Sequence, residues 1–260
     1  MNIPILSIVI PTKDRYETLL PLLDYLISIL NSSIEIIIQD NSKDNFQIKR
    51  FLEKYNKHNN LKYFHSADDL SVIENCDAAV SNANGEYVCF IGDDDGIMSY
   101  TLDVVKWMKL EKIKVLKSYK PHYYWPNQVS SFTSTDQSGA IEFHDFNYTI
   151  EEIDISVILN RVLNQGGSFM DKLPSVYHGI IHSSILKNIF SKFNTYFPGP
   201  SPDMANAIAI TQLISKYMTR FKKGNIINIS SVAGLDLSAG NCAYGTSKAA
   251  VIAFSKTLSS

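Results

Sequence analysis

Residues 85–95 spell GEYVCFIGDDD, an apolar run that ends in a glycine and three adjacent aspartates. The run from Tyr87 to Ile91 is rich in β-branched and aromatic side chains, which predicts a buried β-strand. The three carboxylates repel one another, and burying them costs several kcal/mol unless something neutralises them. A hard divalent cation that also bridges phosphates would neutralise them. If only the triplet is considered, a solvated acidic turn after the strand is an equally good interpretation.

The composition is that of an ordinary globular protein. The chain has 260 residues, of which 45% are hydrophobic and 19% are charged, enough for one large domain or two small ones. Its net charge of −2 gives no electrostatic case for binding nucleic acid or an anionic membrane surface. Cys76, Cys89 and Cys242 form no disulfide framework or metal-binding spacing, so a reducing cytoplasm is expected.

Neither a signal peptide nor a membrane-spanning segment is expected. The first residues lack a basic region followed by a long apolar one. No apolar stretch approaches the roughly 18 residues that a membrane span needs. We therefore expect a cytoplasmic protein, which could still associate peripherally with the inner face of a membrane.

Strand and helix patterns alternate through the first half of the chain. Apolar runs predict strands at 6–10, 34–38 and 61–64. Apolar residues at helical spacing predict helices at 19–27 and 70–80, and a charged helix is predicted at about 47–55. This alternation predicts a parallel sheet covered by helices on both faces. In such sheets ligands bind outside the carboxyl ends of the strands, near a switch point in strand order. Thr12, Asp40 and the aspartate triplet all follow predicted strands, which favours a ligand site.

Three motifs resemble the family 2 glycosyltransferases of the GT-A fold. They are residues 7–15 (SIVIPTKDR), 36–44 (IIIQDNSKD) and 85–95, in family order within the first hundred residues. The resemblance implies an α/β fold with a GT-A-type, Rossmann-like, mostly parallel sheet and helices on both faces. It covers about residues 1–210, with nucleotide-sugar binding in about 1–118 and the acceptor-side region in about 119–210.

The resemblance also implies roles for the matching residues. Thr12 and Asp40 would hold the base and ribose of a nucleotide-sugar donor, and Asp93 and Asp94 would lie near that donor. Asp95 would ligate Mg²⁺ or Mn²⁺ on the diphosphate, where the metal would neutralise the charge of the departing group. Asp40 could instead be a turn residue that accepts hydrogen bonds from its own backbone.

An inverting transfer needs a further carboxylate as general base. Asp203 fits because a proline-rich loop leads it into an apolar helix, where the family usually carries this aspartate. Its position also suits a first-turn residue that the helix dipole favours. His178 could contact acceptor or diphosphate, although a lone histidine among aromatic residues is commonly structural. Lys13 and Arg15 could reach phosphate, but a basic pair at a helix start is commonly solvated.

The last fifty residues resemble the active-site segment of short-chain dehydrogenases/reductases. Residues 224–231 (GNIINISS) predict a strand that ends in serines, the second of them Ser231. Tyr244 and Lys248 lie four positions apart, on one face of a predicted helix. The resemblance implies that Ser231 orients a substrate and that Lys248 lowers the pKa of Tyr244, the acid/base. It covers about residues 211–260, as a strand–helix fragment.

This fragment is not expected to work as a dehydrogenase alone. The glycine-rich turn that receives a dinucleotide pyrophosphate should follow the first strand, which instead leads to Pro11 and Thr12. The chain also stops twelve residues after Lys248. We therefore interpret the chain as a gene fusion joined near 207–212, whose tail docks on the transferase part or stays poorly ordered.

The sequence predicts a metal-dependent, inverting glycosyltransferase. Its partners would be a nucleotide-diphosphate sugar donor and an unknown glycan or lipid-linked acceptor, as in surface polysaccharide synthesis, with no nucleic acid. Two alternatives stay open. One is an NAD(P)-dependent short-chain oxidoreductase, and the other is a truncated fusion that binds nucleotide without turnover.

Overall fold

The computed structural model of this chain describes residues 3–118, 121–124, 139–142, 155–165, 172–199, 201–221 and 227–229, together with Met170. Ser231, Tyr244 and Lys248 lie outside these residues. Their assignment to an oxidoreductase site therefore stays a prediction.

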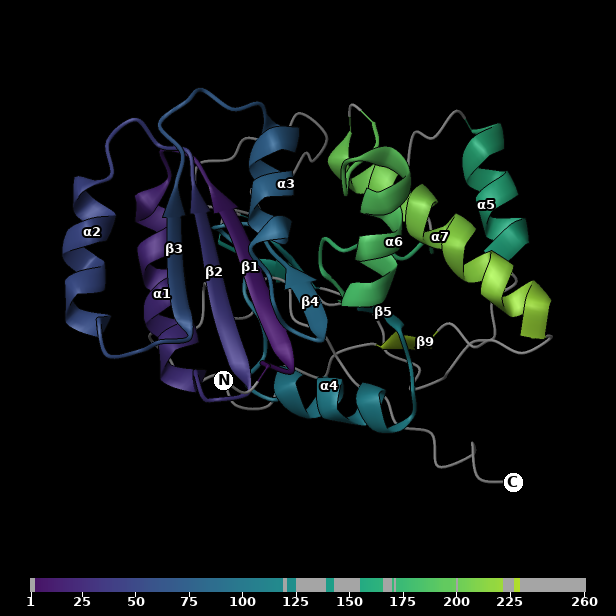
Figure 1. The fold of residues 1–260 in the computed structure, drawn as a ribbon, viewed down its shortest axis with the longest axis horizontal. Helices are drawn as coiled ribbons and strands as arrows, with labels where there is room; N and C mark the ends of the chain where they lie inside the picture. The colour runs from purple at the N-terminus through teal and green to yellow at the C-terminus, as the bar shows by residue number, and fades with distance from the viewer. Residues whose placement is uncertain are drawn as a thin grey trace.

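A seven-stranded sheet forms the centre of the molecule (Figure 1). Its strands are β1 (Leu6–Thr12), β2 (Ile34–Asp40), β3 (Leu61–His65), β4 (Tyr87–Phe90), β5 (Val115–Ser118), β8 (Gly179–His182) and β9 (Ile227–Ile229). The spatial order is β3-β2-β1-β4-β8-β5-β9, in which β8 runs antiparallel to both neighbours and every other pair is parallel. A separate ribbon pairs β6 (His122–Tyr123) with β7 (Ile141–Glu142). The expected mostly parallel α/β sheet is confirmed.

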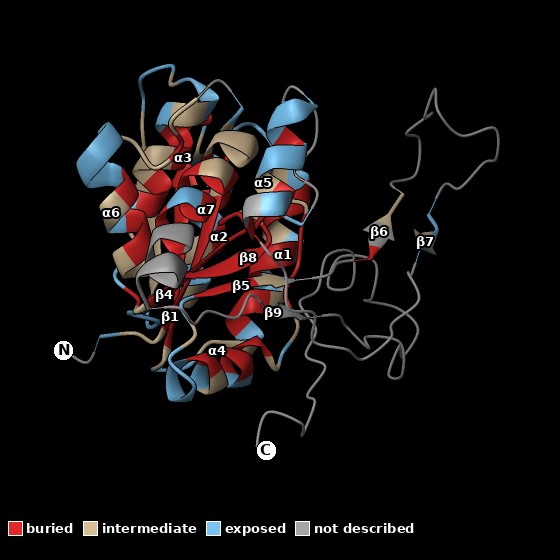
Figure 2. Cartoon of the chain, turned by 90° about the vertical axis from the view of Figure 1, so that its right-hand side faces the viewer, coloured by how far each residue is buried: buried red, intermediate tan, exposed pale blue. Residues whose placement is uncertain are grey.

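Helices cover both faces of this sheet. They are α1 (Tyr16–Ile29), α2 (Phe46–Leu52), the 3-10 turn η1 (Glu53–Tyr55), α3 (Val72–Ser81), α4 (Thr101–Leu110), α5 (Ile155–Asn164), α6 (Ser183–Phe193) and α7 (Pro202–Phe221). One hydrophobic core packs α1, α2 and α4 against the sheet, and a second packs α3, α5, α6 and α7 against the other face. Figure 2 shows the buried residues following the sheet between these layers.

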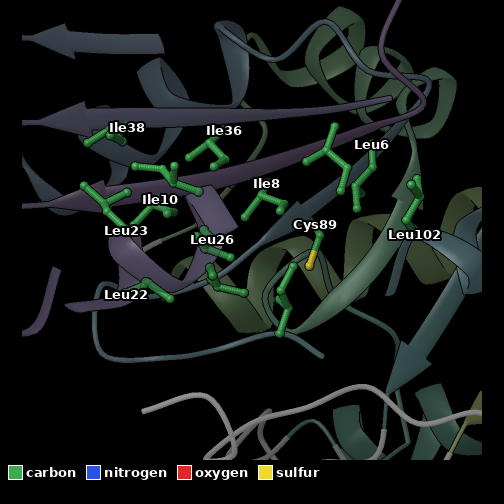
Figure 3. Packing of buried hydrophobic residues seen from close by; sticks show 14 of the residues in the cluster. Leu6, Ile8, Ile10, Leu22, Leu23, Leu26, Ile36, Ile38, Cys89 and Leu102 are labelled. Atoms are coloured by element: carbon green, nitrogen blue, oxygen red, sulfur yellow. The ribbon is translucent and has the colours of Figure 1, made fainter. Parts of the chain in front are cut away.

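The central strands contribute to both cores because their side chains alternate between faces. Ile8 and Ile10 belong to the core on the α1 side, and Val9 between them belongs to the other core. Figure 3 shows Ile10 near Leu23 and Ile8 near Leu26 of α1. All of β2 and nearly all of β1 are buried. Continuous apolar runs are typical of parallel strands covered on both faces, which is why the sequence predicted them.

A buried carboxylate, Glu35, lies at the edge of the sheet where the amino ends of the parallel strands meet. Glu35 in β2 accepts hydrogen bonds from Ser7 Oγ at 2.6 Å, Lys62 Nζ at 2.5 Å and the Asn84 backbone N–H at 2.6 Å. Gly85 lies against this group, because a Cβ there would come within 2.5 Å of Ser7 Oγ. The fold buries Glu35 fully, and these donors satisfy its carboxylate. This network lies at the end of the sheet opposite the cavity described below.

Helix α7 runs without interruption through the predicted join at 207–212. Beyond it, β9 pairs in parallel with β5, from Leu116 opposite Ile227 to Ser118 opposite Ile229. These three residues of β9 belong to the segment that resembles a dehydrogenase. This pairing agrees with the expectation that this part of the tail docks on the transferase part of the chain.

Candidate active site

A cavity of about 480 Å³ opens at the carboxyl ends of β1, β2 and β4. The chain leaves β1 toward β2 and β3 on one side and returns to β4 on the other, so this is the switch point in strand order. The wall comes from the loops after β1 and β4, from Asn41 after β2, from the first turns of α3 and α7, and from Tyr177. Ligands of open α/β sheets bind at this place, as the strand ends in the sequence predicted.

The end of β1 and the end of β4 meet through Thr12 and Asp93. Thr12 Oγ1 donates a hydrogen bond to Asp93 Oδ2 at 2.7 Å, in a buried setting. Burial raises the pKa of Asp93 to about 6, against the opposing effects of Thr12 and the Arg15 guanidinium. Two of the sequence-predicted site residues, 81 positions apart in the chain, are therefore in direct contact at the cavity wall.

Arg15 joins the cavity as a second partner of the aspartates. Its Nη1 lies 3.3 Å from Asp93 Oδ1 and its Nη2 lies 2.9 Å from Asp94 Oδ2. The guanidinium is half exposed, so it faces the cavity while it neutralises both carboxylates. From the sequence, Arg15 was expected to be a solvated residue at a helix start. The fold brings it to the aspartates because β1 and β4 are neighbours, a pairing that local sequence does not specify.

Asp95 is not among the residues that line the cavity. It is fully buried, and its Oδ2 accepts the Gly92 backbone N–H at 2.8 Å and lies 2.5 Å from His178 Nε2. Tyr177 also hydrogen-bonds to Asp95; burial and this carboxylate raise the pKa of the phenol. Asp93 and Asp94 therefore line the cavity, whereas Asp95 does not. Its assignment as metal ligand stays a prediction.

Asp40 is likewise buried and surrounded by donors. Its Oδ2 accepts the hydroxyls of Tyr16 at 2.6 Å and Tyr63 at 2.8 Å, and its Oδ1 accepts the Ser42 backbone N–H at 2.8 Å. The Ser42 contact is the turn bond that the sequence analysis kept as an alternative. Asp40 does not line the cavity, whereas its neighbour Asn41 does. The predicted contact between Asp40 and a nucleotide remains a prediction.

Asp203 reaches the cavity from the first turn of α7. Three residues further along the helix, Asn206 is fully buried; its Oδ1 accepts the Val176 N–H and its Nδ2 donates to Tyr196 O, both at 2.9 Å. Residues three apart lie on one helix face, so Asn206 holds this face of α7 against the segment before β8. Sequence reasoning missed Asn206; its polar side chain among apolar helix positions was the available signal.

The carboxylates supply the hard oxygen donors that Mg²⁺ and Mn²⁺ prefer. In the described part of the chain, however, no group of three or more His, Cys, Asp or Glu side chains is arranged to hold a metal ion. Asp93 and Asp94 are paired with Arg15, and Asp95 with His178. The donor chemistry suits a divalent ion, but binding one requires these pairs to exchange partners.

Two family models match the chain. Residues 7–109 match glycosyl transferase family 2, and residues 204–260 match short chain dehydrogenase. Residues 7–109 form a family 2 glycosyltransferase domain. Both resemblances seen in the sequence are confirmed. This glycosyltransferase domain contains Thr12, Arg15 and the aspartate triplet, whereas Asp203 directly precedes the dehydrogenase match.

The glycosyltransferase domain shares its fold with TarS of S. aureus. A TarS fragment, 1–349, superposes with a TM-score of 0.56 and 20% identity, covering 88% of this chain and 58% of that one. The same fragment in complex with UDP gives a TM-score of 0.54 and 21% identity, with the same coverage. At this identity the likeness shows the fold alone.

The chain is also similar to curated relatives with alcohol dehydrogenase-related names. The alcohol dehydrogenase-related 31 kDa protein of Drosophila persimilis is 29% identical over 177 residues, and that of Drosophila guanche is 30% identical over 179. Each alignment covers 67% of this chain and 58% of the relative, so the chain spans less than two thirds of these relatives. Both alignments are longer than 204–260 and so include residues outside it. Among the described helices, none combines the length and apolar character needed to cross a bilayer.

Proposed function

We propose that this protein transfers a sugar from a nucleotide-diphosphate sugar to the hydroxyl of a glycan or lipid-linked acceptor in the cytoplasm. The observation that carries the proposal is the cavity at the switch point, where Thr12, Asp93 and Asp94 of the family 2 domain line the wall. Asp203 of α7 lines the same cavity and would act on the acceptor hydroxyl.

Donor binding would use the cationic part of this wall. Arg15 and Lys13 both line the cavity, and both are partly exposed. A diphosphate carries the charge that these side chains can neutralise, and the planar guanidinium of Arg15 can bind two phosphate oxygens at once. Structures of the S. aureus TarS fragment contain UDP and UDP-GlcNAc, which makes UDP the first nucleotide to test here.

The transfer step would use Asp203 as general base. Its carboxylate would take the proton of the acceptor hydroxyl as the hydroxyl oxygen attacks the anomeric carbon. The bond from that carbon to the diphosphate oxygen breaks at the same time, and the nucleoside diphosphate leaves with the bonding electrons. Attack from the face opposite the leaving group inverts the anomeric centre.

Metal dependence is part of the proposal. Asp93 and Asp94 would supply oxygen ligands to Mg²⁺ or Mn²⁺ once Arg15 turns to the donor phosphates. Asp95, the ligand predicted from the sequence, would first have to exchange His178 for the ion. A bound divalent ion would neutralise the charge that develops on the leaving diphosphate.

Thermal-shift titration tests the proposal. UDP, GDP and NAD(H) are compared, each with and without Mn²⁺, and we expect a nucleoside diphosphate to raise the melting temperature. Stabilisation by NAD(H) alone would favour the oxidoreductase alternative and overturn the proposal. Binding of UDP without turnover of any UDP-sugar would instead favour the fusion that binds nucleotide without transfer.

A further inference from the structure

Asn41 links three segments of the chain at the wall of the cavity. It directly follows β2, is 4% exposed and is one of the residues that line the cavity. Its backbone N–H donates to the carbonyl oxygen of Thr12, at the end of β1, at 3.0 Å. Its side chain makes three hydrogen bonds to residues 66–70, in the loop that leads from β3 to α3. The ends of β1 and β2 and this loop are therefore joined through one residue.

The loop uses both amide hydrogens of the Asn41 side chain. Its Nδ2 lies 3.1 Å from the carbonyl oxygen of Ser66 and 2.5 Å from that of Asp68, and its Oδ1 accepts the Leu70 backbone N–H at 3.1 Å. Carbonyl oxygens can only accept and a backbone N–H can only donate, so these partners fix the orientation of the amide. Because both hydrogens already have an acceptor, the amide acts on a ligand through the loop that it holds.

This loop carries one side of the cavity. Residues 70–72, at the end of the loop and the start of α3, line the cavity. A second link to the loop comes from Lys13, whose Nζ lies 2.5 Å from Asp69 Oδ1. Both of these side chains are largely exposed, and exposed ion pairs contribute little to stability. The buried hydrogen bonds of Asn41 are therefore the stronger restraint on the loop.

Helix α3 has anchors of its own. Ser71 Oγ accepts the Glu74 backbone N–H at 3.2 Å, and Glu74 Oε2 accepts the Ser71 backbone N–H at 2.8 Å. This reciprocal capping box fixes the start of the helix. The buried apolar residues of α3 also belong to the core that contains α7. Loss of the Asn41 side chain should therefore loosen residues 66–70 and leave the helix in place.

We propose that Asn41 is a positioning residue for the nucleotide donor, whose amide holds the 66–70 loop so that the wall at 70–72 is formed before the donor binds. This inference rests on the proposed function, since it concerns the cavity proposed for that donor. A ligand loses less free energy when it binds to a wall that is already ordered than when it must order the wall itself. Asn41 thus contributes to donor affinity through the loop, and it takes no part in the transfer step.

The UDP affinity of Asn41→Ala tests this assignment. The substitution removes all three side-chain hydrogen bonds and adds no charge. Calorimetry at a temperature where both proteins are folded should show UDP, or GDP if the wild type prefers it, binding about tenfold more weakly to the variant, which must order the loop on binding. Amide hydrogen exchange should become faster in residues 66–70 and stay unchanged in α3. Asn41→Ser, which keeps a polar group at this position, serves the same purpose if the alanine variant does not fold.

The matched control is Ser7→Ala, at the opposite end of the sheet. Ser7 Oγ donates to Glu35 Oε1 at 2.6 Å in a buried setting, so this variant should melt at a lower temperature and bind UDP with wild-type affinity. If Asn41→Ala is likewise less stable but binds UDP as the wild type does, Asn41 is only structural and the assignment is overturned. Weaker UDP binding without faster exchange in the loop also overturns it, since Asn41 would then contact the nucleotide directly. Failure of the wild-type protein to bind any nucleoside diphosphate overturns the proposed function, and the positioning role with it.

Discussion

His178 Nε2 lies 2.5 Å from Asp95 Oδ2, although the two residues are 83 positions apart in the chain. The His178 backbone N–H also donates to Phe90 O at 2.9 Å, so this residue is bound both to the end of β4 and to the loop that follows it. Its backbone has a φ of 58°, in the left-handed region that few side chains favour. The segment before β8 is thereby held against the aspartate triplet, beside the wall residue Tyr177.

His178→Ala should therefore destabilise the fold. The substitution removes a hydrogen bond from a fully buried carboxylate, a loss of about 2 kcal/mol in the free energy of unfolding. His178→Asn should lose less, because asparagine tolerates a positive φ and its amide can donate. Chemical denaturation of the three proteins measures the difference. Equal stability of His178→Ala and wild type would contradict a structural role for the pair.

Asp203→Asn should separate binding from transfer. The amide cannot take a proton from an acceptor hydroxyl, so turnover should fall by at least about 100-fold. UDP affinity should change by less than about twofold, because the donor-side residues belong to other elements. Release of UDP from UDP-sugars and calorimetric titration with UDP supply the two measurements.

Asn206→Ala is the matched control on the same helix face. It leaves the buried Val176 N–H without its side-chain acceptor, which should reduce the free energy of unfolding by about 1–3 kcal/mol. It retains the carboxylate of Asp203, so its turnover should exceed that of Asp203→Asn. Equal turnover in wild type and Asp203→Asn would remove Asp203 from the mechanism.

The strands and the cavity could be predicted because their signals are local. Apolar runs in β1, β2 and β4 are ended by polar residues, and parallel strands bring those ends to one edge of the sheet. Thr12 and Asp93 were therefore expected near each other before any contact was known. Their hydrogen bond follows from the pairing of β1 with β4.

The partners of the predicted carboxylates could not be derived in the same way. Tyr16 and Tyr63 bind Asp40 from α1 and β3, and no spacing rule links residues on different elements. The same is true of His178 and Asp95. Whether a strand-end carboxylate lines the cavity depends on these long-range contacts, which is why Asp93 and Asp94 line it and Asp95 does not.

Glu35→Gln should make stability depend less on pH. Burial alone would raise the pKa of Glu35, but hydrogen bonds from Lys62, Ser7 and the Asn84 N–H lower it below its ordinary value. A carboxyl whose pKa is lowered on folding stabilises the protein above its unfolded pKa of about 4.3, and this contribution is lost as the pH falls through the folded pKa. The variant should lose about 2 kcal/mol at pH 7.

Denaturation curves between pH 7 and pH 3 measure this effect. The difference between wild type and Glu35→Gln should shrink as the pH falls below about 4, where the wild-type carboxyl becomes protonated. UDP affinity at pH 7 should be unchanged, since Glu35 lies at the opposite end of the sheet from the cavity. A stability difference that stays constant with pH would show that shape, rather than charge, explains the loss.

Arg15→Gln should reveal whether a metal ion binds at Asp93 and Asp94. In the free protein the guanidinium lies 3.3 Å from one carboxylate and 2.9 Å from the other, so a cation must displace it. Removing that competitor should strengthen Mn²⁺ binding without nucleotide about threefold or more, since opposite charges at this distance contribute about 1 kcal/mol. The same variant should bind UDP more weakly, because it lacks the cation proposed for the diphosphate.

Electron paramagnetic resonance of free Mn²⁺ measures the first effect, and calorimetry with UDP measures the second. In the wild-type protein, UDP should strengthen Mn²⁺ binding, because the phosphates draw Arg15 away from the aspartates. Lys13→Gln is the matched control: Lys13 pairs with Asp69 rather than with the triplet, so Mn²⁺ affinity without nucleotide should stay at the wild-type value. If Arg15→Gln and Lys13→Gln bind Mn²⁺ equally, the ion does not compete with Arg15, and Asp93 and Asp94 are not its ligands.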